Sequence, residues 1–258
     1  MNMITTATMK APPQDSIDQK LDEFAASLDD RIQHLLGDIM ETECWKVLTS
    51  PNSDPEFVKL IMREVYLEIY SYQPQVIEAT IAVISRMPKK DPKMMLKMLV
   101  HQAEEADHGE MALRDYVALG GDEKYARNRR MSPASFAVAS LWWGLWRMED
   151  PFSYLGALYP FEGLTPIVCQ KVRGCLSAQG YPERAMEFIG FHAQEDIRHA
   201  NLVRKLLKYA VKTYPQAAES ISTGIEYFLQ VYPIPVWNTA YLRARVMHNN
   251  TSSKAGRR

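Results

Sequence analysis

The sequence predicts an all-α fold, and three observations support this prediction. Apolar residues recur with the 3.6-residue spacing of amphipathic helices in almost every periodic segment. Strand-like alternation is nearly absent, and prolines and glycines fall where helices would begin or end. The chain has 258 residues, 47% of them hydrophobic and 24% charged, which is ordinary for one globular domain with a sizeable core.

The first half of the chain is expected to form helices joined by short polar loops. A helix begins at Ser16, a suitable N-cap, and ends at Gly37, and a short helix covers residues 40–48. The long apolar segment that follows must be kinked or divided at Pro74, because proline removes a helix hydrogen bond. The next helix spans residues 91–119 and ends at a glycine pair suited to a C-cap.

Helix signals continue through the second half. Ser132 caps a helix whose first position is Pro133. A long helix entered at Pro182 contains a motif rich in ionisable residues. The other expected helices carry residues 159–172, cover residues 215–231, and form a last segment ending near residue 247.

Domain organisation and charge exclude several classes of protein. We expect a single domain over residues 16–248, a disordered segment over residues 1–15 and a disordered basic tail over residues 249–258. The net charge is −1 and the pI is about 6.6, so neither nucleic acid nor an anionic membrane is expected as a partner. A small-molecule substrate is expected, and a homodimer is compatible with these observations.

The three cysteines, Cys44, Cys169 and Cys175, are odd in number and have no CxxC spacing. Neither a disulfide framework nor a thiolate zinc site is therefore indicated, and a reducing cytoplasm fits best. The chain start lacks the continuous apolar core of a signal peptide, and no stretch of about 18 apolar residues exists. We expect a soluble, cytoplasmic protein.

The stretch FHAQEDIRHA, residues 191–200, places ionisable groups on a stripe that should be buried. His192, Asp196 and His199 stand at i, i+4 and i+7, so they share one helix face within about two turns. A single buried histidine is usually a satisfied core residue. Three ionisable groups on one apolar stripe need a further explanation.

Other helices repeat this pattern. Glu105 and His108 form a carboxylate-x-x-His unit, as Asp196 and His199 do. Two such units plus one carboxylate from each of two further helices are typical of dinuclear iron or manganese bundles. Glu78 and Glu162 are lone acids among apolar neighbours, where an unpaired carboxylate would be costly. The predicted metal ligands, which are also the catalytic set, are Glu78, Glu105, His108, Glu162, His192, Asp196 and His199, whose four carboxylates would neutralise two divalent cations.

Two positions beside this set stay open. Glu104 could replace Glu105, since it also approaches His108 on the helix. His101, two turns before His108, could be a ligand or could hold another ligand by a hydrogen bond. For each acid taken singly, a solvated face or an ion pair is the commoner explanation, and only the joint pattern favours a metal site.

The ordered set Glu78, Glu105-x-x-His108, Glu162 and His192-x3-Asp196-x2-His199, with HAQED in the last motif and EG at the lone glutamate, resembles the heme-oxygenase-like diiron oxidases. The similarity spans residues 66–205, and its most specific part is His-x3-Asp-x2-His. The resemblance implies a bundle of about seven or more helices, shared with heme oxygenase and the thiamin-salvage enzymes. The thiamin-salvage enzymes use a cysteine nucleophile and have no need of this histidine-rich set.

The resemblance also implies chemistry. The cofactors would be two Fe(II) ions, with O2 as co-substrate and an external electron donor as an option. Known outcomes in the family include N-oxygenation, oxidative decarboxylation, carbon–carbon cleavage and use of a protein side chain as the substrate. We expect an oxidase or oxygenase that acts on a small amino acid or carboxylic acid.

Aromatic and basic residues near these motifs suggest a substrate pocket. Trp142 and Trp146 are candidates for its wall, and Arg147 or Arg173 for the anchor of a substrate carboxylate. Core packing and surface arginines explain the same residues about equally well. Arg198 is expected to turn toward solvent. Other candidates are Phe136, Tyr154 and Tyr159 for the wall, and Arg243 and Arg245 for the anchor.

Three other classes of function remain open at this level. A binuclear metallohydrolase would use the same ligands without O2. An iron-storage or redox bundle would oxidise iron without an organic substrate. A metal-free interaction protein would keep its full thermal stability without metal.

Overall fold

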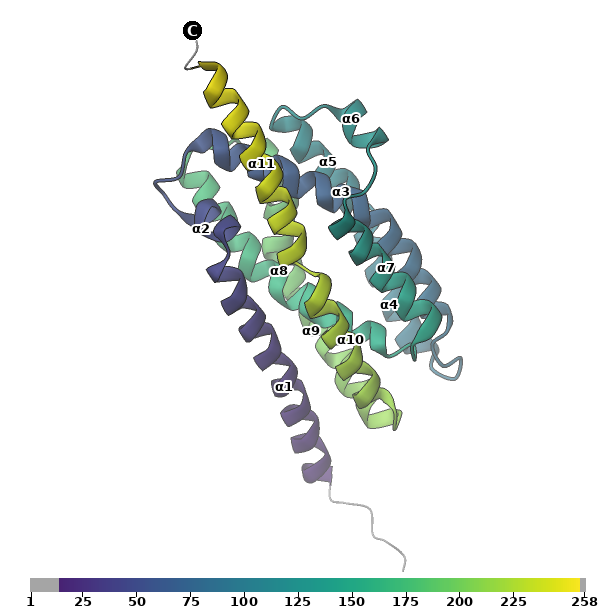
Figure 1. Ribbon diagram of the computed structural model, residues 1–258. Coiled ribbons are helices and arrows are strands. Elements are labelled where there is room, and N and C mark those ends of the chain that lie inside the picture. The colour runs from purple at the N-terminus through teal and green to yellow at the C-terminus, as the bar shows by residue number, and fades with distance from the viewer. Residues whose placement is uncertain (1–13, 256–258) are drawn as a thin grey trace, which may run out of the picture.

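The computed structural model describes residues 14–255, and within that range the chain is helical and contains no strand. Figure 1 shows a bundle of long helices with short connections. The helices are α1 (Gln14–Glu41), α2 (Glu43–Thr49), α3 (Pro55–Ser85), α4 (Pro92–Glu105), α5 (His108–Ala118), α6 (Glu123–Asn128), α7 (Pro133–Met148), α8 (Ser153–Ala178), α9 (Glu187–Thr213), α10 (Ala217–Val231) and α11 (Ile234–Ala255), with a short 3-10 turn, Glu183–Ala185, before α9.

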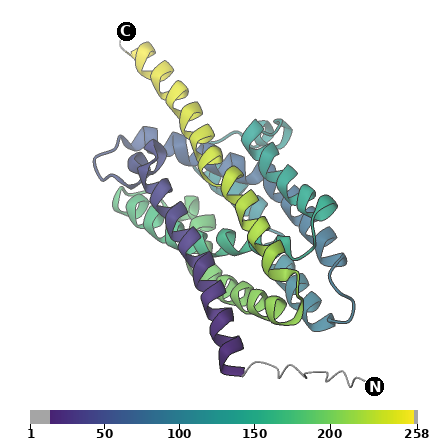
Figure 2. The ribbon, with the colours of Figure 1, turned by 60° about the horizontal axis from the view of Figure 1, so that its bottom comes forward.

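Two long helices organise the bundle. Helix α8 packs along α9 and α10, and α3 packs against α5, α7 and α11. Both views show α11 lying across the face of the bundle, with its last turns reaching beyond the other helices (Figures 1 and 2). The space enclosed by α3, α4, α5, α8 and α9 therefore lies in the middle of the molecule.

The crossing of α8 and α10 depends on two glycines. A Cβ atom at Gly156 would lie 1.9 Å from the carbonyl oxygen of Ile221, and one at Gly224 would lie 1.8 Å from that of Ser153. Any larger residue would therefore collide with backbone, which cannot swing aside as a flexible side chain can. This close approach fixes α8, and with it the position of residues farther along the helix.

A buried charged cluster attaches α7 and α11 to α3. Glu68 is fully buried, and its Oε1 atom lies 2.7 Å from both Arg129 and Arg243. The hydroxyl groups of Ser132 and Ser135 donate to its Oε2 atom. A buried carboxylate is stable only with such partners, so this cluster accounts for the charged residues of α3 that face α11.

Helix α9 receives its N-terminal cap from another helix. The side chain of its own N-cap residue, Met186, makes no capping hydrogen bond. Instead the carboxylate of Asp115 on α5 accepts hydrogen bonds from the backbone N–H groups of Glu187, at 3.0 Å, and Phe188, at 2.8 Å. A carboxylate at this end also interacts favourably with the helix dipole. The cap ties α9 to α5.

Several predicted boundaries are confirmed. Ser132 caps α7 by accepting from the Ser135 N–H group at 3.0 Å, and Pro133 is the first residue of that helix. Gly120 follows α5 with a φ of 84°, the left-handed conformation of a glycine C-cap. Caps and glycine stops are local features, which explains why the sequence alone located them.

Other boundaries differ from the prediction. Helix α3 runs past Pro74 without division, and α1 continues through Gly37 to Glu41, because packing against neighbouring helices outweighs local propensity. The helix expected over residues 91–119 breaks at residues 106–107.

The expected chain ends also need correction. Residues 14–15 belong to α1, and α11 continues through residues 249–255, where no proline or glycine stops it. The remainder of the two segments predicted to be disordered lies outside the described residues. Within residues 14–255, no helix combines the length and the apolar character that crossing a membrane would require.

Candidate metal centre

Four helices bring ionisable side chains together in the middle of the bundle. Helices α4 and α5 meet at the break over residues 106–107, which places the end of one and the start of the other beside α8 and α9. All the side chains concerned are buried, with at most 5% of their surface exposed. They are His101, Glu105, His108, Glu162, His192, Asp196 and His199.

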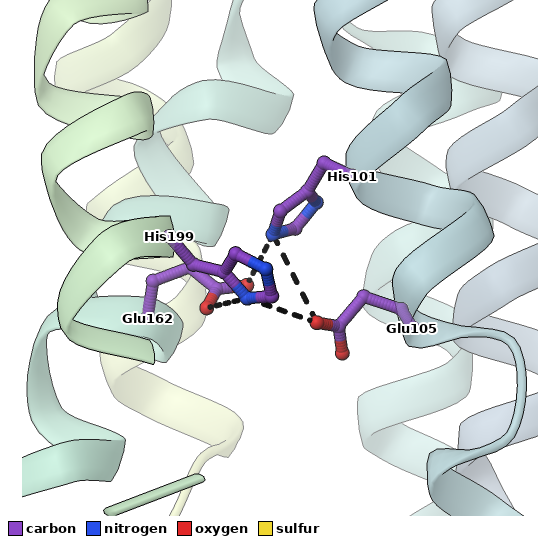
Figure 3. Close-up of side chains that lie close together, drawn as sticks. All are labelled: His101, Glu105, Glu162 and His199. Carbon is purple, nitrogen blue, oxygen red and sulfur yellow. Dashed lines mark ion pairs between the residues drawn. The ribbon is translucent and has the colours of Figure 1, made fainter. Parts of the chain in front are cut away.

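The first group of donors consists of His101, Glu105, Glu162 and His199, whose ligand atoms all lie within 4.8 Å of one another. Figure 3 shows the two imidazoles and the two carboxylates converging from opposite sides of the bundle. Nε2 of His101 lies 3.1 Å from Glu162 Oε1, and Nδ1 of His199 lies 3.2 Å from Glu105 Oε1. This spacing leaves room for one cation among the four side chains.

The second group consists of Glu105, His108 and His192, which meet the same 4.8 Å limit. Nδ1 of His108 lies 2.6 Å from Glu105 Oε2 and 3.0 Å from His192 Nε2. Glu105 therefore belongs to both groups, with Oε1 facing one and Oε2 facing the other. A carboxylate shared in this way is suited to bridging two metal ions.

Hydrogen bonds orient three of the imidazoles. Nδ1 of His192 donates to the backbone oxygen of Phe188 at 2.6 Å, which leaves the lone pair on Nε2, the atom that lies 3.0 Å from His108 Nδ1. Nε2 of His199 donates to Glu104 at 3.0 Å, which leaves Nδ1 facing the carboxylates. The Gln102 amide lies 3.0 Å from Nδ1 of His101. Glu104 thus acts through His199, and His101 belongs to the donor set itself.

The electrostatics of the carboxylates reflect this crowding. Burial raises the pKa of Glu105, but the neighbouring His108 and His199 outweigh this effect and hold the pKa well below its usual range. Burial also raises the pKa of Glu162, but the facing imidazoles of His101 and His199 outweigh this effect and hold the pKa below its usual range. Both groups are therefore negatively charged at neutral pH and available to a cation.

The remaining residues titrate differently. Burial, followed by the charge of nearby carboxylates, raises the pKa of Asp196 to about 8 against the effect of His199. Burial lowers the pKa of His199, but the carboxylates facing it raise the pKa to about 12. Burial and the charge of His108 lower the pKa of His192 to about 4. At pH 7 His199 therefore carries a proton in the metal-free protein, whereas His192 is neutral.

Unpaired polar atoms provide a test of whether these residues fit metal ions. Buried atoms without a hydrogen-bond partner among the described residues normally carry a large free-energy cost. Five of the ten such side-chain atoms belong to this cluster: His101 Nε2, Glu105 Oε1, His108 Nε2, Asp196 Oδ1 and His199 Nδ1. Imidazole nitrogens with carboxylate oxygens are a donor set that suits ferrous iron. The residues fit two such ions.

One predicted ligand is not brought to the centre. Glu78 is exposed on α3, so the predicted ligand set needs correction at this position. The side of α3 that faces the centre carries Gln73, Val76, Ile77 and Thr80, which follow the i, i+3, i+4, i+7 rule of one helix face. Glu78 lies off this stripe. The other six predicted residues lie together, and His101 joins them.

The residues predicted to contact the substrate separate into two sets. Trp142 is fully buried beside the centre, whereas Trp146 is only half-buried and packs against Trp143. Arg147 is exposed, and Arg173 pairs with Glu183 at 3.1 Å on the surface. Arg147 therefore faces solvent and Arg173 lies in a surface ion pair, so neither arginine lies where it could anchor a substrate at the centre.

The other aromatic and basic candidates have partners elsewhere. Tyr154 is buried near the centre and accepts a hydrogen bond from Gln102 at 3.3 Å. Phe136 is 64% exposed, and Tyr159 hydrogen-bonds Asp29. Arg198 points to the surface, as predicted, and there pairs with Glu104. Arg243 is part of the Glu68 cluster, and Arg245 stacks on Tyr241.

An apolar cavity of about 60 Å³ adjoins the centre between α3 and α8. His192 forms part of its wall, and so do Tyr66, Tyr72, Phe161 and Phe188. Among the described residues, no lysine, arginine or acidic side chain lines this cavity. An apolar organic molecule could occupy it in contact with the imidazole of His192.

Comparison with known proteins gives a consistent picture. The model of a family described as "iron-containing redox enzyme" matches residues 63–232, more than half of the chain. A 4-aminobenzoate synthase from Chlamydia pneumoniae is 26% identical over 120 residues, 46% of this chain and 54% of that protein. The chain thus spans about half the length of this curated relative.

Solved structures resemble the whole fold. A domain of unknown function with a heme oxygenase-like fold from Shewanella denitrificans gives a TM-score of 0.71 at 16% identity, covering 93% of this chain and 96% of that one. A TenA homologue from P. horikoshii gives 0.59 at 16% identity, covering 88% and 99%. A TenA homologue from Pseudomonas syringae gives 0.61 at 13% identity, covering 92% and 99%. The predicted heme-oxygenase-like, all-α fold is confirmed.

Proposed function

Because this chain belongs to the family of iron-containing redox enzymes, we propose that it is an O2-dependent oxidase or oxygenase with two non-heme ferrous ions. The observation that carries the proposal is Glu105, whose two oxygens face two separate groups of buried donors. Two ferrous ions with open positions can bind and reduce O2 and so oxidise an organic molecule held beside them.

The ions would be held by the seven residues of the cluster. His101, Glu162 and His199 would bind one ion and His108 and His192 the other, with Glu105 shared between them. Asp196, 3.6 Å from Nδ1 of His199, would complete the set. Three carboxylates and four imidazoles then surround the two cations.

Residues around the ligands prepare the centre for this chemistry. The backbone oxygen of Phe188 and the carboxylate of Glu104 accept from Nδ1 of His192 and Nε2 of His199, so the other nitrogen of each ring would bind metal once His199 has lost its second proton. Without metal, Asp196, with a pKa of about 8, also holds a proton at neutral pH, which it would lose on binding metal. The apolar cavity excludes water from the side of His192 and gives a substrate a dry place to bind.

We propose that the substrate is a small organic molecule. The candidate reactions, which the experiment must distinguish, are N-oxygenation, oxidative decarboxylation and carbon–carbon cleavage. The relative described as a 4-aminobenzoate synthase supports biosynthetic chemistry on a small aromatic compound. An amino-acid or carboxylic-acid substrate, as expected from the sequence, would need an anchor other than Arg147 or Arg173.

The test is anaerobic loading with ferrous iron, followed by exposure to O2 with and without candidate organic acids, amines and alcohols. We expect two irons per chain, a transient visible absorbance on mixing with O2, and oxygen consumption that a substrate accelerates. The Glu105→Gln variant is the matched control and should give no transient. Iron uptake well above two per chain would contradict the proposal, and so would substrate turnover that continues undiminished without O2.

A further inference from the structure

A second, smaller cavity adjoins the metal centre. Its volume is about 10 Å³, enough for the centre of one water-sized group. The wall includes Glu105 and Glu162 from the metal centre, together with Gln102 of α4 and Trp142 of α7. A small chemical group placed here would lie directly beside the two carboxylates.

Two polar atoms in this wall are unpaired. Trp142 is fully buried, yet its Nε1–H group has no acceptor among the described residues. Gln102 is 5% exposed, and its Oε1 atom likewise has no donor within the described part of the chain. A buried indole N–H usually finds a partner. One oxygen atom carrying a proton could satisfy both, accepting from Trp142 and donating to Gln102.

The small cavity adjoins the larger apolar one. Gln73 and Phe161 line both cavities, so the two cavities share part of their walls. A molecule whose apolar body occupies the larger cavity would extend a short polar end past these shared side chains toward Trp142. Glu105 and Glu162 line the small cavity, so this polar end would lie beside the metal centre.

Charge restricts what the polar end can be. Neither cavity has a lysine or arginine in its wall, as far as the described residues extend. A carboxylate near Trp142 would accept from its N–H group but has no proton to donate to Gln102 Oε1, and in the metal-free protein it would also lie beside the charged carboxylates of Glu105 and Glu162. A neutral hydroxyl group accepts from Trp142 and donates to Gln102 without adding charge.

We propose that Trp142 and Gln102 form a specificity subsite for a neutral hydroxyl oxygen of the substrate, whose apolar or aromatic body fills the cavity beside His192. This inference rests on the proposed function for the identity of the ligand as substrate. It departs from the carboxylate anchored by arginine that the sequence suggested.

The experiment compares the binding of three probes by ligand-observed NMR: benzyl alcohol, toluene and benzoate. The protein is loaded anaerobically with ferrous iron, and a parallel series uses the metal-free protein. Toluene has the same ring without the hydroxyl, and benzoate carries a full negative charge. We expect benzyl alcohol to bind about three- to ten-fold more tightly than toluene, the effect of one net hydrogen bond. In the metal-free series we expect benzoate to bind more weakly than benzyl alcohol.

The decisive variant is Trp142→Phe, which removes the N–H group and keeps an aromatic ring. It should abolish the preference for benzyl alcohol over toluene. Any enlargement of the cavity affects both probes and cancels in the ratio. Trp143→Phe is the matched control, because the Trp143 N–H group already donates to Gln75 at 3.1 Å and should not influence the ratio.

A second measurement does not depend on the variant folding. In the unsubstituted protein labelled with 15N-tryptophan, one of the five indole N–H resonances should shift with benzyl alcohol and not with toluene. The inference is wrong if no probe binds, if benzoate binds most tightly in the metal-free series, or if the alcohol preference is absent or survives Trp142→Phe. The last result would mean that Trp142 holds a structural water only. Because the metal-free series needs no iron, a failed iron-binding test of the proposed function is distinguishable from a failed subsite.

Discussion

Replacing the shared carboxylate tests the two-ion arrangement most directly. In Glu105→Gln, the side chain keeps its size and loses its charge, so the buried packing around it is retained. Oε1 of Glu105 faces His199 at 3.2 Å, and Oε2 faces His108 at 2.6 Å, so one substitution affects both groups of donors. We therefore expect weaker binding of both irons.

The expected loss of iron affinity can be estimated from what neighbouring groups contribute to metal sites. Loss of a hydrogen-bond partner of a ligand costs about 10- to 100-fold in metal affinity. Loss of a charged ligand should cost at least the upper value, ~2.7 kcal/mol for each ion. His101→Ala removes a donor from the first group only, and His192→Ala removes one from the second group only. Each of these variants should lose affinity for one iron and retain the other.

Anaerobic titration with ferrous iron, followed by quantitation of bound iron per chain, measures these effects. Glu78→Gln is the control, because its side chain is exposed and should leave both affinities unchanged. The reasoning is refuted if Glu105→Gln binds two irons as tightly as the parent. It is also refuted if Glu78→Gln reduces the stoichiometry as Glu105→Gln should.

Three further predictions concern stability and protons. Gly224→Ala should lower the free energy of unfolding by about 1–3 kcal/mol through overpacking. Gly174→Ala is the control and should not destabilise the protein, because nothing lies within 4 Å of the added Cβ. Equal losses of stability in denaturant titrations of the two variants would contradict the close helix crossing. Asp115→Ala should lower the free energy of unfolding by about 1–2 kcal/mol, because it removes the cap of α9. Asp115→Asn should lower it less, and thermal melts of the two variants can show the difference. Metal binding at pH 7 should release protons, because His199, with a pKa of about 12, and Asp196, with a pKa of about 8, must lose theirs. Iron affinity should therefore rise with pH between about 6 and 8. Calorimetry in buffers of different ionisation enthalpy would detect the released protons. If metal binding released no protons, the result would count against this ligand set.

The sequence was most informative where one helix carries several members of the site. His192, Asp196 and His199 lie on a single stripe of α9, whose opposite face is polar, so the helix period alone puts them together. Glu105 and His108 were also identifiable, although the helix expected there breaks between them. Their spacing still brings both side chains to the centre, since the break occupies only residues 106–107.

Helix α3 shows why the prediction failed for Glu78. Its buried residues occur on several sides, because it packs against α5, α7 and α11 at once. A helix that is apolar almost all round has no clear inward face, so an isolated acid in it cannot be assigned a direction from local sequence. The cavities beside Trp142 and His192 were unpredictable for a related reason, since they depend on how α3 and α8 pack.

The correction from Glu78 to His101 changes the charge of the centre. Three carboxylates, Glu105, Glu162 and Asp196, would leave two bound ferrous ions with one uncompensated positive charge, where four would have left none. Glu104 supplies negative charge from outside the donor set. It accepts a hydrogen bond from Nε2 of His199 at 3.0 Å, so it stabilises electron donation from Nδ1 of the same ring toward the metal. Because Glu104 is partly exposed and also pairs with Arg198, solvent and that ion pair weaken its compensation, and a loaded centre would keep some positive character. Charge alone would therefore not exclude a carboxylate from the loaded centre, and the preference for a hydroxyl group beside Trp142 rests on the proton that it can donate to Gln102.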